Sequence, residues 1–369
     1  MRVLVCPDKW KGSLTAAEAA AAIGRGIRAA WPDVELDLLP LADGGEGSRE
    51  ILAGAWNLKP RRLTVTGPLR RPVAATYSLG RGRAVIETAA ACGLQLVPPT
   101  RRNPEDTTTV GVGNLIDDAL ARGAREVYLL LGGSSTNDCG AGMAAALGYR
   151  FFTEANHDIV PMAGSLAAVD RIASDAVSPL LQEARIVALC DVRNPLLGLS
   201  GATYMYARQK GASEEALPRL EEGMRHFAGV VERDLGVPVT TREAGGAAGG
   251  LGAGCVAFLG AELLPGTDVI FPALSFTERA SAADLSFTGE GSLDEQTLQG
   301  KVVAATLAAG KPTIAVCGRC TLDGTACGLD AILSLETYSS LPLVTRMARA
   351  GELLQQMVTD YCLRHKEYW

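Results

Sequence analysis

The first forty residues combine short apolar runs with one helical pattern. Val3–Cys6 is a continuous apolar run, which is typical of a buried strand. A polar loop at 7–13 follows, and an Ala-rich segment over Thr15–Ala30 has Glu18 at the spacing of a helix-capping box. A second strand is predicted at Glu35–Pro40. This order of strand, helix and strand predicts an α/β fold with a parallel sheet.

The same order of apolar strand, polar loop and helix recurs three times later in the chain. It is visible at 127–148, 185–197 and 283–309, and another strand is predicted at 313–317. Between about 64 and 87 the pattern changes to short alternating strands separated by glycine breaks. We take this change as the first candidate domain boundary.

Composition and charge restrict the function to a few classes. With 369 residues, 47% of them hydrophobic, the chain can bury a large core and is expected to form two domains. Its net charge of −6 predicts no general attraction to nucleic acid or to an anionic membrane, so small molecules are the expected partners. The nine cysteines are an odd number and several lie in apolar strands. Reduced thiols and the lack of a signal-peptide pattern predict a cytoplasmic protein.

One loop is rich in glycine, hydroxyl and amide groups. It follows an apolar strand, precedes a predicted helix and consists of Gly132, Gly133, Ser134, Ser135, Thr136 and Asn137. Two glycines allow a tight turn, and the free N–H groups at a helix start attract anions, so phosphate is the simplest ligand. The alternative is an ordinary strand-to-helix turn with polar caps. No Walker A motif occurs in the sequence.

Two further loops carry pairs of carboxylates after predicted strands. Asp43 and Glu46 lie three residues apart on a glycine-rich turn, and Glu290 and Asp294 follow a later strand. Carboxylate oxygens can hold Mg²⁺ or bind substrate hydroxyls, although Asp-Gly-Gly is equally typical of a plain turn. Because open α/β sheets bind ligands at the carboxyl ends of their strands, we expect these loops to converge.

Other charged residues are predicted at the same edge. Asp191 emerges directly from an apolar strand, where it is either a turn cap or a general base or metal ligand. Lys301 is predicted on the helix after the third loop. The first loop adds four polar residues: Asp8, Lys9, Lys11 and Ser13. Acids, lysines and a phosphate loop at the ends of five strands favour phosphoryl transfer.

Three weaker motifs complete the inventory. Gly249–Gly254 resembles half of a dinucleotide fingerprint, but no apolar strand precedes it, so we interpret it as close helix packing or as a second loop near the ligand. Cys317 and Cys320 have CxxC spacing without a second pair for zinc. The three histidines are isolated in the sequence. A dehydrogenase or a zinc enzyme is therefore disfavoured.

At these loops the sequence resembles the type-1 glycerate kinase family over essentially the whole chain. The segments that carry the resemblance are Pro7–Ser13, Ala42–Gly47, Asn103–Gly111, Gly132–Met143, Asp191–Gly198, Gln209–Ala212 and Gly289–Lys301. The chain departs from the family pattern at three points. Lys9 replaces a serine, Ser292 replaces the usual arginine, and the helix after Lys301 is shorter than usual.

The resemblance implies an enzyme that phosphorylates D-glycerate with ATP and Mg²⁺, with 2-phosphoglycerate favoured over 3-phosphoglycerate. It implies a flavodoxin-like α/β domain whose parallel sheet is built from both chain ends (1–66 and 285–369), and a second α/β domain inserted between them (67–284). The active site is expected in the cleft between these domains, in a monomer or a homodimer. The alternatives are a kinase of another small hydroxy acid and a non-catalytic sensor of a nucleotide or metabolite.

Each motif then has an expected role. Asp191 is the expected base, while Lys11 and Lys301 offset the charge on the transferred group. The loop from Gly132 to Asn137 is expected to hold phosphate groups. Mg²⁺ is expected to bind carboxylates of Asp43, Glu46, Glu290 and Asp294, directly or through water. Glycerate is expected to contact Asp8, Lys9, Ser13 and Asp43.

Overall fold

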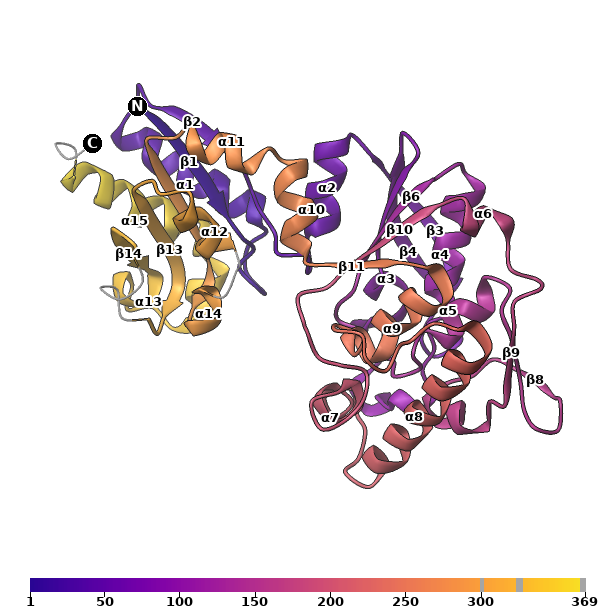
Figure 1. Ribbon diagram of the computed structural model, residues 1–369. Coiled ribbons are helices and arrows are strands. Elements are labelled where there is room, and N and C mark those ends of the chain that lie inside the picture. Colours follow the sequence, from indigo (N-terminus) through magenta and orange to yellow (C-terminus); the bar gives the residue numbers. More distant parts are fainter. Residues whose placement is uncertain (299–301, 323–327, 366–369) are drawn as a thin grey trace. The chain divides into compact units, whose positions relative to one another are not determined.

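The computed structural model describes residues 1–298, 302–322 and 328–365, and it divides into two compact units (Figure 1). Unit 1 comprises Met1–Asp43 and Thr267–Trp369, and unit 2 comprises Gly44–Gly266. These limits differ from the sequence-based limits at residues 66 and 285. One reason is that β3 (Lys59–Thr66) pairs along its whole length with β4 (Pro72–Gly80), and this pairing places it in the sheet of unit 2.

The sheet of unit 1 is entirely parallel. Its strand order is β14-β13-β12-β1-β2, and its strands are β1 (Arg2–Pro7), β2 (Glu35–Leu38), β12 (Leu285–Leu293), β13 (Thr313–Cys320) and β14 (Ala331–Ser334). Counted along the chain within the unit, this is the order 2-1-3-4-5 of flavodoxin-like folds. The predicted α/β class with a parallel sheet is confirmed.

Helices cover both faces of this sheet because both faces of its central strands are apolar. Val3 and Val5 face a core shared with α1 (Ala16–Ala30) and α15 (Ala350–Arg364). The alternate residues Leu4 and Cys6 face a second core. The helices α11 (Phe276–Ser281) and α12 (Val302–Ala308) contribute to that core, and the remaining helices of the unit are α10 (Gly266–Ala273), α13 (Leu335–Tyr338) and α14 (Leu343–Ala348).

The predicted start of the first helix is confirmed. Thr15 Oγ1 accepts a hydrogen bond from the Glu18 N–H at 3.2 Å, and the Thr15 N–H donates to the Glu18 carboxylate at 2.8 Å. This is the reciprocal capping box that the spacing of the two residues predicts. Two N–H groups that the first turn of α1 leaves without helical partners are satisfied in this way.

Unit 2 contains a mixed six-stranded sheet of order β11-β10-β6-β5-β4-β3. The strands β5 (Arg83–Glu87), β6 (Glu126–Leu130), β10 (Arg185–Leu189) and β11 (Glu262–Leu264) are parallel, whereas β3 and β4 form an antiparallel edge. A small antiparallel sheet has the order β8-β7-β9 and consists of β7 (Arg150–Phe152), β8 (Asp158–Ile159) and β9 (Arg171–Ala173).

Helices of different lengths surround the larger sheet. They are α2 (Ser48–Trp56), α3 (Ala89–Cys92), α4 (Val110–Ala121), α5 (Ala141–Ala146), α6 (Pro179–Gln182), α7 (Ala202–Tyr206), α8 (Ala216–Leu235) and α9 (Ala247–Leu259). Short 3₁₀ turns lie at Leu94–Leu96, Pro99–Arg101, Pro104–Asp106, Ala163–Ala168, Arg208–Lys210 and Glu295–Leu298. Among the described residues, no helix has the length and apolar character needed to cross a membrane.

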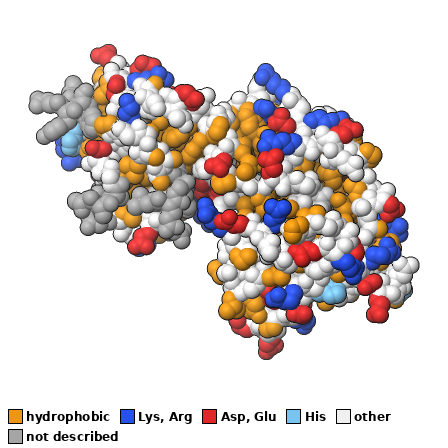
Figure 2. Space-filling model, viewed as in Figure 1, with side chains coloured by type: hydrophobic (Ala, Val, Ile, Leu, Met, Phe, Trp, Pro, Cys, Tyr) orange, Lys and Arg blue, Asp and Glu red, His pale blue; other side chains and the backbone are white. Residues whose placement is uncertain are grey.

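Two arginines of β3 and β5 form ion pairs with acids of neighbouring elements. The Arg61 guanidinium lies 2.9 Å from the Asp118 carboxylate, and that of Arg83 lies 3.0 Å from Glu126. On the face seen in Figure 2, basic and acidic side chains are interspersed and form no continuous basic surface.

Candidate active site

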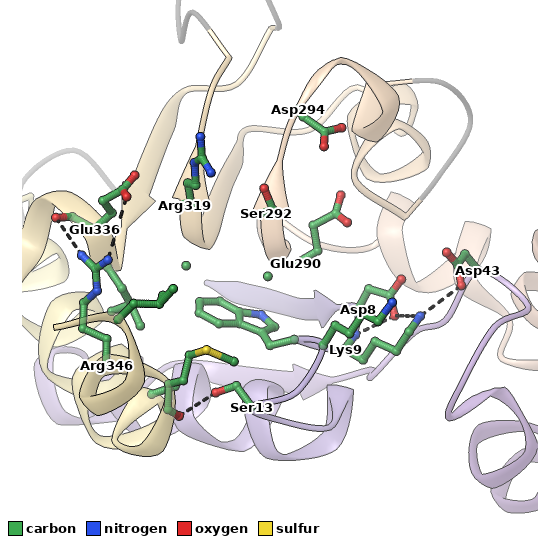
Figure 3. Close-up of a pocket in the computed structure, with 18 residues that line it drawn as sticks. Asp8, Lys9, Ser13, Asp43, Glu290, Ser292, Asp294, Arg319, Glu336 and Arg346 are labelled. Carbon is green, nitrogen blue, oxygen red and sulfur yellow. Dashed lines mark hydrogen bonds and ion pairs between the residues drawn. The ribbon is translucent and has the colours of Figure 1, made fainter. Parts of the chain in front are cut away.

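A cavity of about 900 Å³ opens at the carboxyl end of the unit 1 sheet (Figure 3). Its walls come from the segment after β1, from the ends of β12 and β13, and from α13 and α14. The strand order reverses between β1 and β12, and open α/β sheets bind ligands at such a switch point. The cavity is therefore the first candidate for substrate binding in unit 1.

Residues from three distant stretches of chain meet in this cavity, as their positions after strands predict. The predicted site residues that line it are Asp8, Lys9, Lys11, Ser13, Asp43, Glu290 and Asp294. Sequence reasoning missed Arg319, Leu343 and Arg346, which line the same cavity. The position of Arg319 at the end of a predicted strand was a usable signal, whereas the two residues of α14 follow no motif.

Backbone contacts explain why the acidic residues meet. The Asp8 N–H donates to the Gly289 carbonyl at 2.8 Å, which joins the end of β1 to β12 just before Glu290. Gly289 has φ +152°, and a Cβ on it would lie 1.8 Å from the Val316 carbonyl oxygen. Only glycine therefore allows β12 and β13 to approach so closely while presenting Glu290 to the cavity.

The acidic end of the cavity is electrostatically unusual. Asp8 is only 5% exposed, and burial, together with the negative charges of Asp43 and Glu290, raises its pKa to about 7. Lys9 opposes this shift. Its backbone N–H donates to the Asp8 carboxylate at 2.6 Å, and its ammonium lies 3.3 Å from the Asp43 carboxylate. The carboxylates are therefore crowded, and one of them is partly protonated near neutral pH.

Two of the departures from the family pattern line this same cavity. Lys9 lies between the carboxylates of Asp8 and Asp43, at 3.7 Å and 3.3 Å. Ser292 pairs in register with Arg319 on the neighbouring strand β13, and both residues are exposed. The family pattern has an arginine at the position of Ser292. In this chain Arg319, the neighbour of Ser292 on β13, brings a guanidinium to the same part of the cavity.

The carboxylates fit a magnesium ion bound together with phosphates better than one bound by protein alone. Within the described residues, no three Asp, Glu, His or Cys side chains form a group that could hold a metal ion. Mg²⁺ usually keeps several waters and binds one or two carboxylates together with substrate phosphates. The crowded negative charge around Asp8 fits this mode, with Asp43, Glu290 and Asp294 on the cavity wall.

The glycine-rich loop of unit 2 is built differently. Gly132 and Gly133 are exposed, whereas Ser134, Ser135, Thr136 and Asn137 are at least 96% buried. Ser134 Oγ donates to the Ala248 carbonyl and Ser135 Oγ to that of Cys92, each at 2.9 Å. The hydroxyls of these serines thus bond to the protein itself. What the loop offers to an external anion is the backbone of its two glycines.

A buried lysine, to which sequence reasoning assigned no role, holds this loop from behind. Lys210 is 3% exposed, and its ammonium donates to Ser134 Oγ at 3.0 Å and to the Thr136 carbonyl at 2.7 Å. Burial lowers its pKa to about 8, partly offset by the negative potential of Cys92 and Asp138. Its only signal in the sequence was its place in Gln209–Ala212, one of the segments that carry the resemblance.

The helix α9 packs against the same loop. Gly249 has φ +76°, and a Cβ on it would lie 2.0 Å from the Thr136 carbonyl oxygen. At Gly254, a Cβ would lie 2.3 Å from the Cys139 carbonyl oxygen. Gly249 lies in a non-helical turn at residues 248–250, whereas Gly254 lies in the helical part of α9. The motif therefore packs closely through its backbone, and both interpretations of it, helix packing and a second loop near the ligand, stay predictions.

The remaining predicted residues have separate surroundings. Asp191 is exposed, follows β10 and accepts a hydrogen bond from the Gly266 N–H at 3.4 Å. Glu46 is exposed in unit 2, just before α2. Ser13 lines the cavity of unit 1, but its hydroxyl donates to the Met347 carbonyl at 2.7 Å and thereby anchors α14. Lys301 lies outside the described residues.

The chain is similar to known proteins over nearly its whole length. A model of the "Glycerate kinase family" matches residues 3–365. The chain is 41% identical to "Glycerate kinase" of Halalkalibacterium halodurans, covering 96% of this chain and 93% of that protein. It is 40% identical to "Glycerate 2-kinase" of Escherichia coli K12, covering 91% of each. A crystal structure described as glycerate kinase 2 from Salmonella typhimurium LT2 has a TM-score of 0.88 at 39% identity, covering 99% of this chain and 98% of that one.

Proposed function

The chain belongs to the glycerate kinase family of phosphotransferases, and we propose that it transfers the γ-phosphoryl group of ATP to D-glycerate to form 2-phosphoglycerate. The choice of the 2-hydroxyl is supported by the Escherichia coli relative, whose name is glycerate 2-kinase. The observation that carries the proposal is the cavity of unit 1, where acids and lysines from separate family motifs form one wall. Such groups match what phosphoryl transfer requires, namely positioning and neutralised charge.

The proposed bond changes are simple. The glycerate hydroxyl oxygen bonds to the γ-phosphorus while the bond from phosphorus to the β–γ bridging oxygen breaks, and ADP leaves. Asp191 accepts the hydroxyl proton. Its exposed carboxylate, next to the end of β10, is accessible for this role. A base of ordinary acidity suffices, because the proton leaves late in a loose transition state.

The other residues bind and orient. Lys9, Lys11 and Lys301 offset negative charge on phosphate oxygens and on the glycerate carboxylate. Gly132 and Gly133 bind a phosphate through their backbone N–H groups, while Asp8 and Asp43 orient the substrate hydroxyls. Mg²⁺ would be held by Asp43, Glu46, Glu290 or Asp294 with phosphate oxygens, and it would neutralise charge on the triphosphate.

The product isomer tests the proposal directly. The purified chain is incubated with D-glycerate, ATP and Mg²⁺, and the product is identified by phosphorus and proton NMR. We expect 2-phosphoglycerate. Formation of 3-phosphoglycerate would reject the assignment of the 2-hydroxyl, and no phosphoglycerate with any glycerate enantiomer would reject the proposed substrate. A panel of other small hydroxy acids then tests the alternative substrate class, because a missing carboxylate contact should cost most of the activity.

The role of Asp191 has its own test. Asp191→Asn keeps the shape of the side chain and removes the base, so kcat should fall by about a hundredfold or more. Asp175 is an exposed carboxylate of the same unit that the proposal does not use, and Asp175→Asn is the matched control. If the Asp191 variant keeps a near-normal kcat, Asp191 is not the base.

A further inference from the structure

We propose that the end of the unit 1 cavity next to α13 and α14 binds the base of the nucleotide. This inference rests on the proposed function, since it assigns one substrate of the kinase to one part of the site. The ligand class is an adenine nucleotide, with its base at the apolar end and its phosphates directed toward Lys9 and Asp43. The assignment depends on the size of the cavity, on the apolar character of one end, and on the order of charges along it.

The cavity is too large for the hydroxy acid alone. Its volume is about 900 Å³, which lies near the upper end of the roughly 300–1,000 Å³ that ligand cavities occupy. Glycerate has three carbons and would leave most of this volume unfilled. A nucleotide, which has a base, a sugar and phosphates, matches the volume much better. Its location at the switch point of a flavodoxin-like sheet is also where such sheets bind mononucleotides.

Apolar side chains form part of the cavity wall. Trp10, Leu335 and Ala350 are at most 3% exposed, while Met347 and Leu343 of α14 are more exposed. Leu343 is 63% exposed, so its side chain is accessible to a ligand in the cavity. Each of the three carbons of glycerate carries an oxygen, so the acid has little apolar surface to cover these side chains. A purine ring has two apolar faces.

Polar groups are ordered along the cavity. Figure 3 shows Glu336 and Arg346 at the end formed by α13 and α14, and Asp8, Lys9 and Asp43 at the opposite end. The strands β12 and β13 contribute Glu290, Ser292 and Arg319. Arg319 is exposed and makes no ion pair within the described ranges. The α13–α14 end thus combines apolar side chains with the Glu336–Arg346 pair, and lysine with carboxylates lies at the opposite end. This order fits a base at the first end and phosphates with a phosphate-bound cation at the second.

Two adjacent residues of α14 form a matched pair for the test. Leu343 lines the cavity, whereas Val344, which is 79% exposed, does not. Leu343→Asn and Val344→Asn both replace an exposed apolar side chain by a neutral polar one, so neither should affect folding, which circular dichroism would verify. ADP binding is measured by calorimetry without glycerate. We expect Leu343→Asn to weaken it by about fivefold, and Val344→Asn by less than about twofold.

Pyrophosphate separates the base from the phosphates. Because pyrophosphate has no base, its affinity should be the same in the wild-type chain and in both variants. The KM for glycerate should also stay unchanged. Equal ADP affinities in the two variants, or a change in the glycerate KM with no change in ADP binding, would overturn the inference. An equal loss for pyrophosphate and ADP would also overturn it, because Leu343 would then act on the phosphates.

The outcomes distinguish this inference from the proposed function. ADP binding needs no turnover, so a selective loss in Leu343→Asn supports the nucleotide site even if the chain forms no phosphoglycerate. Conversely, a chain that forms 2-phosphoglycerate but binds ADP equally well in both variants keeps its function and loses this site. The two hypotheses therefore fail separately.

Discussion

The cavity of unit 1 and the Gly132–Asn137 loop of unit 2 both collect polar side chains at the carboxyl ends of parallel strands, but their surroundings differ. In the loop, hydroxyl groups donate to nearby carbonyls and the buried Lys210 binds two loop oxygens. In the cavity, burial and, to a smaller extent, the carboxylates of Asp43 and Glu290 raise the pKa of Asp8 to about 7. The serine hydroxyls of the first cluster have partners within the protein, whereas Thr136 Oγ1 and Asn137 Oδ1 are buried without one among the described residues. The second cluster presents its charged groups to the cavity, where a ligand can pair with them.

This difference shows why polar motifs have to be judged by exposure. Hydroxyl and amide groups after a strand can bind a ligand or can build the loop, and their sequence pattern is the same for both. Exposure separates the two cases, because a side chain that is buried within the chain is not presented to a ligand at the surface. In unit 2 the side chains build the loop and the glycine backbone remains for a ligand. In unit 1 the charged side chains themselves face the cavity.

The largest expected effect is on catalysis by the cavity. Asp43→Asn removes a carboxylate that lies 3.3 Å from the Lys9 ammonium and that faces the proposed magnesium phosphate. We expect kcat to fall about a thousandfold, equivalent to about 4 kcal/mol, with a much smaller change in the KM for glycerate. Steady-state kinetics would measure this. Asp33 is an exposed carboxylate of the same unit, and Asp33→Asn should leave kcat unchanged.

If Asp43→Asn affects only KM, Asp43 contributes equally to substrate and transition-state binding, and the cavity is a binding surface without a catalytic carboxylate at this position. That result would weaken the contrast between the two clusters.

The next effect is on the stability of the loop. Gly249→Ala places a Cβ 2.0 Å from the Thr136 carbonyl oxygen at a residue with φ +76°. We expect the free energy of unfolding to fall by about 3 kcal/mol, measured by urea denaturation. Gly229 in α8 has no atom within 4 Å of such a Cβ, and Gly229→Ala should stabilise the chain by up to about 1 kcal/mol. Equal effects of the two substitutions would contradict the close packing of α9.

A smaller loss is expected when the buried lysine is replaced. Lys210→Met leaves Ser134 Oγ and the Thr136 carbonyl without the ammonium, but it also removes a buried charge. The net destabilisation should be about 2 kcal/mol. Lys59 is exposed on β3, and Lys59→Met should change the free energy of unfolding by less than about 0.5 kcal/mol. If the Lys210 variant is as stable as the wild type, the ammonium does not hold the loop.

The last prediction is a pH dependence of the free energy of unfolding that arises from Asp8. Over any single pH unit this effect is smaller than the effects above. Its pKa is about 7 in the folded chain against an ordinary value of 3.8, so between these values the folded state keeps a proton that the unfolded state has lost. The free energy of unfolding should therefore fall as pH rises from about 4 to 7, by at most about 1.4 kcal/mol per pH unit for this group. Asp8→Asn should reduce this slope, whereas Asp33→Asn should preserve it. Equal slopes in all three proteins would contradict the crowding of carboxylates in the cavity.

Much of the fold and of the cavity could be predicted from local patterns. The apolar run of β1 and the spacing of Thr15 and Glu18 mark elements that depend on neighbouring residues only. The meeting of Asp8, Asp43 and Glu290 followed from a general rule, because parallel strands end at one edge of their sheet. These inferences needed no knowledge of which strand pairs with which.

The sequence by itself thus determined the α/β class, the start of the first helix and seven of the residues that line the unit 1 cavity, namely Asp8, Lys9, Lys11, Ser13, Asp43, Glu290 and Asp294. Only the tertiary structure decided that the side chains of Ser134 to Asn137 point inward, that Lys210 supports them, and that Leu343 and Arg319 border the cavity. The physical reason is that exposure and hydrogen-bond partners depend on residues up to hundreds of positions apart. Lys210 contacts the loop through packing that no local pattern records, whereas strand and helix signals arise within a few residues.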